Sequence, residues 1–202
     1  MLRVAVTGGI ASGKTTVVGL LANWGSRVLS ADRIAREVVR PGAAGWQRVR
    51  QAFGPQVFTA AGELDRARLA ARVFADPAAR QQLEQLLHPL IMQTLWHRLA
   101  VLQLNGRVPV VVVEVPLLFE CGLQDRFDCA VLVWTSRARQ ERWLRVRSGL
   151  STAEVAQRLG AQMPLDDKRA RADYIIDNTA DVAALSSAVA RLWPQLWCRA
   201  CG

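Results

Sequence analysis

The first sixteen residues constrain the fold of this chain more than any other stretch. Residues 2–6, Leu-Arg-Val-Ala-Val, form a short apolar run. Residues 8–15, Gly-Gly-Ile-Ala-Ser-Gly-Lys-Thr, then fit the pattern G-x-x-x-x-G-K-[ST] at every fixed position. This pattern requires a buried strand, a glycine turn and the start of a helix. The stretch therefore predicts an α/β chain whose first strand leads through a phosphate-binding loop into a helix.

The loop residues have the chemistry that a triphosphate needs. Glycine lets backbone N–H groups turn inward around phosphate oxygens, and a helix that begins near Lys14 directs its positive end at the same anion. Lys14 can bridge the outer phosphates, and the Thr15 hydroxyl can ligate Mg²⁺. A plain glycine turn is the alternative. We expect a nucleoside triphosphate to bind these residues: Gly9, Ala11, Ser12, Gly13, Lys14, Thr15 and Thr16.

Length and composition fit a single cytoplasmic chain. The 202 residues suit one domain with small insertions, and 51% of them are hydrophobic. The sequence has no apolar run of the roughly 18 residues that a membrane-spanning helix needs, and its start lacks a cleavable signal pattern. The four cysteines are expected as reduced thiols, and the Cys198-x-x-Cys201 pair as part of a frayed tail rather than a metal or redox site.

The chain is strongly basic, with a formal net charge of +9 and 26 basic residues, of which only two are lysines. Such a charge can serve nucleic acids, membrane surfaces or small anions. The arginines are spread over several predicted helices, and aromatic residues are not interleaved with them as a base-stacking platform requires. We therefore expect neither a nucleic-acid nor a membrane partner.

Four more strands are predicted, and they alternate with helices as in a doubly wound, five-stranded parallel sheet, where ligands bind at the carboxyl ends of the strands. These strands are expected at 27–30, 110–115, 129–134 and 174–176, with a last helix over 180–193. Residues 41–107 lack a strand-like run and suit helices near 44–53, 66–74, 77–87 and 89–103. We expect a nucleotide-binding core (1–40, 108–135 and 171–202), a helical acceptor-binding insertion (41–107) and a small helical lid (136–170).

Two carboxylates follow predicted strands near the loop. Asp32 comes directly after 27–30, where it can orient an acceptor hydroxyl and take its proton. An N-cap of the following helix is the alternative role. Glu114 ends a buried strand, where a carboxylate is costly unless it meets a metal, water or a donor. We favour a water-mediated metal contact for Glu114 over a simple hydrogen-bonding role.

Arginines crowd the segment 137–147, and Arg139 and Arg142 share one face of the predicted helix. From a mobile lid, one or two of them can reach triphosphate oxygens, although a solvated basic face is the equal alternative. His88-Pro89 is read as a boundary between two helices, with a structural role for His88 favoured over a substrate contact.

Several motifs, in order, resemble the dephospho-coenzyme A kinase family over nearly the whole chain. They comprise 7–16 (TGGIASGKTT), 30–32 (SAD), 64–66 (LDR), 83–84 (LE), 88–89 (HP), 116–120 (PLLFE), 140–142 (QER), 162–164 (QMP), 168–169 (KR) and 172–178 (ADYIIDN). The phosphate loop alone indicates only a P-loop protein, whereas the combination is much more specific.

The resemblance implies a P-loop fold similar to nucleoside-monophosphate kinases. It also implies transfer of the ATP γ-phosphoryl group to the ribose 3′-hydroxyl of dephospho-coenzyme A, with Mg²⁺, by a monomer or small homo-oligomer. By position, Asp32 resembles the acidic residue at the acceptor hydroxyl. Other positions resemble the family's substrate side (Arg66, His88 and Leu117), its lid arginines (Arg142) and its nucleotide side (Asn178).

Two departures from the family pattern bear on the site. The family usually has aspartate where Glu114 stands, and glutamate keeps the charge on a side chain one methylene longer. Ala11 replaces a common glycine, which is tolerable if its φ is negative.

Two other functions stay open. Another P-loop kinase, acting on a nucleoside monophosphate or a small metabolite, would share the sheet and the loop. A protein that binds a nucleoside triphosphate or nucleic acid without kinase activity is the other alternative, although a guanine-recognition motif N-K-x-D is absent.

Overall fold

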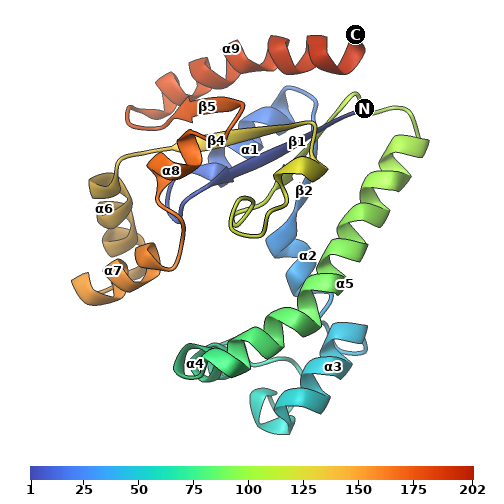
Figure 1. The fold of residues 1–202 in the computed structure, drawn as a ribbon, viewed down its shortest axis with the longest axis vertical. Helices are drawn as coiled ribbons and strands as arrows, with labels where there is room; N and C mark the ends of the chain where they lie inside the picture. Colours follow the sequence, from blue (N-terminus) through green and yellow to red (C-terminus); the bar gives the residue numbers. More distant parts are fainter. The chain divides into compact units, whose positions relative to one another are not determined.

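The computed structural model describes all 202 residues, and it is a five-stranded α/β structure (Figure 1). The strands are β1 (Leu2–Gly8), β2 (Arg27–Ser30), β3 (Val110–Glu114), β4 (Cys129–Trp134) and β5 (Tyr174–Asp177). The helices are α1 (Lys14–Asn23), α2 (Ala31–Glu37), α3 (Ala44–Phe53), α4 (Arg66–Ala75), α5 (Pro77–Leu104), α6 (Arg137–Ser148), α7 (Thr152–Gly160), α8 (Leu165–Arg169) and α9 (Val182–Cys201). Two 3₁₀ turns, η1 (Pro55–Val57) and η2 (Gln124–Arg126), complete the chain.

All strand pairs are parallel, and the sheet order is β2-β3-β1-β4-β5. The register places Glu114 beside both Val6 and Ser30, and Gly8 beside Val133. The carboxyl ends of the strands therefore meet at one edge, which is where parallel sheets bind ligands. The predicted doubly wound, five-stranded parallel sheet is confirmed.

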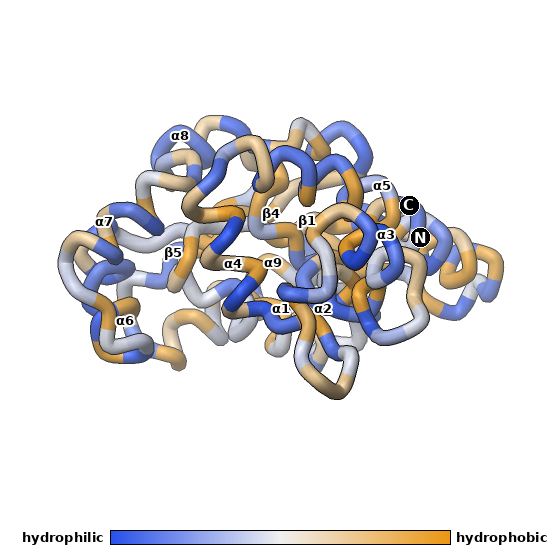
Figure 2. The backbone as a smooth tube through the Cα atoms, turned by 90° about the horizontal axis from the view of Figure 1, so that it is seen from below, coloured by the Kyte–Doolittle hydropathy of each residue, from blue (hydrophilic) through white to orange (hydrophobic).

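The core of the sheet unit consists mainly of buried aliphatic side chains. Val110, Val111, Val112 and Val113 of β3 have no exposed surface, as expected for a central parallel strand that is covered on both faces. Helices α1 and α9 pack together over β1, β3 and β5, and their apolar residues join the valines of the sheet in one cluster. In Figure 2, hydrophobic colour gathers around β1, β4 and α9, whereas hydrophilic segments are frequent in α6, α7 and α8.

The chain divides into two compact units. One unit comprises residues 1–30 and 102–202 and contains the sheet; the other comprises residues 31–101 and is helical. The helical unit has its own core, in which Val49 and Phe53 of α3 pack with Leu69 of α4. Because this core is closed by residues of the unit itself, the unit is a packed body rather than a long loop. The predicted acceptor-binding role of 41–107 stays a prediction.

Helix starts were predicted accurately where polar caps mark them. Asp65 accepts a hydrogen bond from Arg68 N at 3.0 Å, and Asp76 accepts one from Ala78 N at 2.9 Å, at the starts of α4 and α5. Ser151 and Glu154 form a reciprocal capping box at the start of α7. Each cap satisfies an N–H group that the first turn leaves without a helical partner.

The prediction of a helix boundary at His88-Pro89 was wrong, because α5 is one helix of 28 residues that contains Pro89. A proline removes one helical hydrogen bond at a cost of about 3 kcal/mol. Buried side chains on both sides of it, Ala79 and Leu95, hold the helix to the protein. Packing outweighs the local cost, and Figure 1 shows α5 bending partway along its length, as helices do at proline.

The end of the last helix was also placed too early. Helix α9 continues through Pro194 to Cys201, and Leu196, beyond the proline, is completely buried. Cys198 and Cys201 therefore lie on a packed helix and not on a frayed tail.

No helix of the protein is both long enough and apolar enough to cross a membrane.

Candidate active site

The phosphate loop leaves β1 at Gly8 and enters α1 at Lys14, as the motif predicts. Three of its glycines stand where a side chain would collide. A Cβ atom on Gly8 would lie 2.7 Å from Val133 O, one on Gly9 would lie 2.4 Å from Gln140 Nε2, and one on Gly13 would lie 2.3 Å from Asn178 Nδ2. Gly13 also has a left-handed φ of +92°. The loop thus needs glycine both for its turn and for the close approach of its neighbours.

Ala11 is the one residue other than glycine with a positive φ, at 58°. From the sequence alone, alanine is tolerable at this position if its φ is negative, but the observed φ is positive. For an alanine this left-handed conformation costs about 1–2 kcal/mol. Ala11 and Ile10 pack against an apolar cluster of Leu144, Val155 and Leu159, which helps to hold this conformation.

The loop offers donors to an anion. The N–H groups of Ala11 and Gly13 make no hydrogen bond within the protein, whereas that of Ser12 donates to Gly9 O at 3.2 Å. The Ser12 hydroxyl is completely buried and has no hydrogen-bond partner. Buried polar groups without partners are rare in proteins, and a water, an ion or a ligand can supply the missing partner. These donors lie beside the start of α1, so the loop suits a phosphate group.

The ammonium group of Lys14 lies within the loop. Its Nζ donates to Gly8 O at 3.0 Å and to Gly9 O at 2.7 Å. Two loop carbonyls thus hold a positive charge at the place where the motif puts the outer phosphates.

Thr15 and Glu114 approach each other beside the loop, from α1 and from the end of β3. The Thr15 hydroxyl donates to Glu114 Oε1 at 3.2 Å. No group of three or more His, Cys, Asp or Glu residues gathers anywhere in the chain to hold a metal. The pair therefore suits a cation that takes its remaining oxygen ligands from phosphate and water, as Mg²⁺ does.

Asn178 follows β5 and supports the loop from the other side. Its side-chain Nδ2 donates to Ser12 O at 2.8 Å, and its carbonyl accepts from the Thr135 hydroxyl at 2.9 Å. The Asn178 side chain therefore fixes the Ser12–Gly13 corner of the loop. A direct contact between Asn178 and a nucleotide stays a prediction.

The predicted lid arginines lie on α6. Arg139 and Arg142, together with Trp143 and Val146, line a hollow of about 340 Å³. Arg139 donates from Nη1 to Thr179 O at 2.5 Å and from Nη2 to Ala180 O at 2.6 Å, and these contacts hold α6 to the segment after Asn178. Arg142 is exposed, as an arginine that reaches a phosphate must be.

The predicted acceptor-side residues lie mostly on the helical unit. Asp32 is the second residue of α2, so the N-cap role considered for it was wrong. Arg66 is the first residue of α4, and His88 lies within α5. Leu117, on the sheet unit, is 41% exposed after β3, while its neighbour Leu118 is completely buried.

An ion pair fixes α2 on α5 within the helical unit. The carboxylate of Glu37 accepts from Arg98 and from Arg33, and the Arg98 guanidinium chiefly lowers the pKa of Glu37 below its ordinary value. Since Glu37 is the last residue of α2, this pair orients the short helix that carries Asp32.

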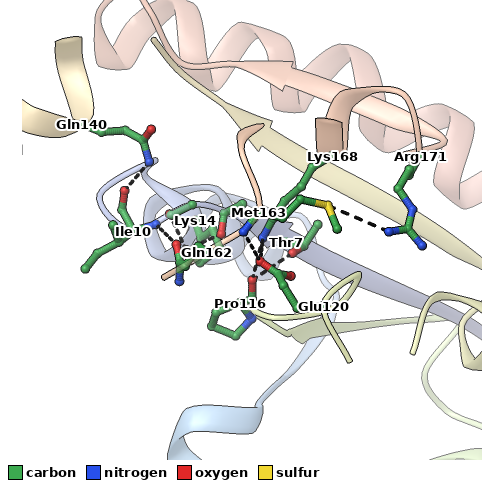
Figure 3. Close-up of polar contacts among 12 residues, drawn as sticks. Thr7, Ile10, Lys14, Pro116, Glu120, Gln140, Gln162, Met163, Lys168 and Arg171 are labelled. Atoms are coloured by element: carbon green, nitrogen blue, oxygen red, sulfur yellow. Dashed lines mark hydrogen bonds and ion pairs between the residues drawn. The ribbon is translucent and has the colours of Figure 1, made fainter. Parts of the chain in front are cut away.

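Four residues around the loop were not singled out from the sequence: Glu120, Gln140, Gln162 and Lys168. Figure 3 shows them converging on the loop and on the segment after β3. They stand in motifs quoted for the family resemblance, but residue type and spacing alone gave them no role. The one available signal was that Lys168 is one of only two lysines among 26 basic residues.

Comparisons with known proteins show the family of this chain. The family model for dephospho-CoA kinase matches residues 2–184. The dephospho-CoA kinase of Anaeromyxobacter dehalogenans is 41% identical over 196 residues, which are 97% of this chain and 92% of that protein. The Arabidopsis thaliana dephospho-CoA kinase is 41% identical over 182 residues, 90% of this chain and 78% of its own.

Solved structures show the same fold. The protein TT1252 from Thermus thermophilus superposes with a TM-score of 0.82 at 35% identity, over 96% of this chain and 97% of its own. A dephospho-CoA kinase from Campylobacter jejuni gives a TM-score of 0.67 at 24% identity, with 96% of each chain covered. The family match and the relatives at 41% identity show that this chain belongs to the dephospho-CoA kinase family, ATP-using kinases that catalyse the last step of CoA biosynthesis.

Proposed function

We propose that this chain transfers the γ-phosphoryl group of ATP to the ribose 3′-hydroxyl of dephospho-CoA, giving CoA and ADP. The observation that carries the proposal is the loop of residues 8–15, which combines the free N–H groups of Ala11 and Gly13, the buried Ser12 hydroxyl and the Lys14 ammonium. Such preorganised donors stabilise the charge of a phosphoryl group in transfer.

Each predicted residue has a step in this proposal. Asp32 orients the acceptor hydroxyl and takes its proton, while Lys14 and Arg142 offset charge on the transferred group. Thr15 and Glu114 would hold Mg²⁺, with Glu114 acting through a water. When bound, Mg²⁺ neutralises charge on the β- and γ-phosphates. The remaining residues bind the acceptor (Arg66, His88 and Leu117) or the nucleotide (Gly9, Thr16 and Asn178).

We also propose that the enzyme works in the cytoplasm as a monomer or small homo-oligomer, with no nucleic-acid partner. All four cysteines are free thiols, which supports a reducing compartment. The spread of the arginines supports small anionic substrates over a nucleic acid.

Product analysis tests the proposed reaction. The protein is incubated with ATP and Mg²⁺ and with dephospho-CoA, AMP or shikimate, and phosphorylated products are identified by mass spectrometry. We expect product only from dephospho-CoA, with the added mass on the ribose 3′-oxygen. Phosphorylation of AMP or shikimate instead would identify another P-loop kinase, and tight salt-sensitive DNA or RNA binding without turnover would support the third function.

A further inference from the structure

Lys168 is the only lysine of the chain besides Lys14 in the phosphate loop, although 26 residues are basic. Its side chain, on α8, is completely buried. The ammonium Nζ lies 2.7 Å from Glu120 Oε1 and donates to Pro116 O at 3.2 Å. A compact ammonium fits this enclosure, where the wider, planar guanidinium of arginine needs more room. Burying such a charge is costly even when it is paired, so net stabilisation of the fold does not by itself explain the pair.

A short series of contacts leads from this ion pair to the phosphate loop (Figure 3). Glu120 Oε1, which pairs with Lys168, also accepts a hydrogen bond from the backbone N–H of Met163 at 3.1 Å. The neighbouring residue, Gln162, directs its Oε1 at the loop and accepts from Ile10 N at 2.8 Å. The pair therefore fixes the backbone from which the Gln162 side chain reaches the loop.

The peptide groups of Ile10 are thereby held on two sides. Gln162 binds its N–H, and Gln140 of α6 donates from Nε2 to its carbonyl at 2.7 Å. Ile10 directly precedes Ala11, whose φ is positive and whose N–H is free for an anion. Two glutamines from outside the loop thus set the direction of the donors that line it.

We infer that Lys168 is a positioning residue: with Glu120 it seats Gln162 on Ile10, and so preorganises the loop N–H groups that receive phosphate. The effect of Lys168 on the reaction rate rests on the proposed kinase function. The effect of Lys168 on the order of the loop does not depend on that function, so each effect can be refuted without the other. A purely structural ion pair would stabilise the protein without a particular influence on residues 8–13.

Hydrogen exchange of the full chain without nucleotide tests the effect on loop order. The variant Glu120→Leu/Lys168→Met removes both charges together and leaves no buried charge unpaired. Gln162→Leu keeps the ion pair and removes only the contact to Ile10. Asp167→Asn, an exposed neighbour of Lys168, is the control. We expect exchange of the hydrogen-bonded loop amides, Ile10 and Ser12, to rise about 10-fold or more in the first two variants, with β3 and α9 unchanged, and no rise in the control.

The outcomes separate the two roles. Unchanged loop exchange in both variants, or an equal rise in every segment of the folded ion-pair variant, overturns the inference. If the ion-pair variant does not fold, the ion pair is structural and the inference also fails.

Steady-state kinetics then tests the link to rate. We expect kcat to fall roughly 10- to 100-fold in each of the two variants, and no further when they are combined, because both act through one contact. If the losses in kcat multiply in the combined variant, the ion pair and Gln162 do not act through the same contact with Ile10. A wild-type protein without turnover would refute the proposed function, while the exchange result would still decide the role of Lys168.

Discussion

The hydroxyl of Thr15 donates a hydrogen bond of 3.2 Å to the carboxylate of Glu114, although 99 residues separate them in the sequence. The parallel register brings them together, because β1 leads into the loop and β3 ends beside it. An exchangeable hydroxyl beside a carboxylate is a ready pair of oxygens for a hard divalent cation. This hydrogen bond supports the proposed Mg²⁺ site at Thr15 and Glu114.

For Glu114→Gln we expect the Mg²⁺ concentration that gives half-maximal activity to rise about 10- to 100-fold, the usual cost of losing a residue that orients metal-bound water. Glu114→Asp keeps the charge and should recover part of this loss. Magnesium titrations of initial rates measure the effect, with the exposed Glu63→Gln as control. An unchanged magnesium requirement in Glu114→Gln would assign Glu114 only a hydrogen-bonding role.

Asp32→Asn should keep ATP binding and lose about 100-fold or more in kcat, because asparagine cannot take the proton of the acceptor hydroxyl. ATP affinity by calorimetry and kcat by initial rates separate the two effects. Asp76→Asn, on the same unit, preserves a cap at the start of α5 and should leave kcat unchanged. If Asp32→Asn changes the melting temperature but not kcat, the residue supports α2 and not the reaction.

Ala11→Gly should stabilise the protein. The left-handed φ of 58° costs an alanine about 1–2 kcal/mol, and glycine removes this cost. The greater conformational freedom of glycine in the unfolded chain reduces the gain by about 0.4–1 kcal/mol. We expect urea unfolding to show a net gain of roughly 0.5–1 kcal/mol. Ala71→Gly, at an exposed position in the middle of α4, should instead lose about 1 kcal/mol. A loss at both positions would show that Ala11 is not strained.

Asp128 anchors β1, because its carboxylate accepts from the backbone and side chain of Arg3. Burial alone would raise the pKa of Asp128, but the bonds from Arg3 outweigh it and hold the pKa below 3.8. A depressed pKa contributes stability above the unfolded value, and this stability is lost as pH falls through the folded value. Asp128→Asn should therefore lower the unfolding free energy by roughly 1–3 kcal/mol at pH 7, and by less near pH 3.

Urea unfolding of wild type and Asp128→Asn at the two pH values measures this difference. Asp167→Asn, an exposed aspartate, should show little change at either pH. An equal loss for Asp128→Asn at pH 7 and pH 3 would contradict the role of the charge.

Burial raises the pKa of the Cys129 thiol to about 11, so little thiolate forms at pH 8. Cys121, Cys198 and Cys201 are exposed. In the native protein we expect three cysteines to react rapidly with a thiol reagent and Cys129 at least about 100-fold more slowly. All four should react at once in denaturant. Equal rates for four thiols in the native protein would show that β4 opens readily.

Local signals predicted the parts of the fold that local physics decides. The loop motif, the helix starts at Arg66 and Pro77 and the valine run of β3 all appear where the sequence places them. Continuation of α5 through Pro89 was missed because packing elsewhere on the helix overcomes the local penalty. The contact of Gln162 with Ile10 joins residues 152 apart, and no periodicity encodes such a pair. The positive φ of Ala11 likewise depends on what surrounds the loop.

The most direct test of the central claim is the rate of ADP release from ATP and Mg²⁺ with and without dephospho-CoA. The proposed function predicts that dephospho-CoA raises the rate far above the ATPase background, with one CoA formed for each ADP. A rate that stays at the background in the presence of dephospho-CoA would contradict the proposed function.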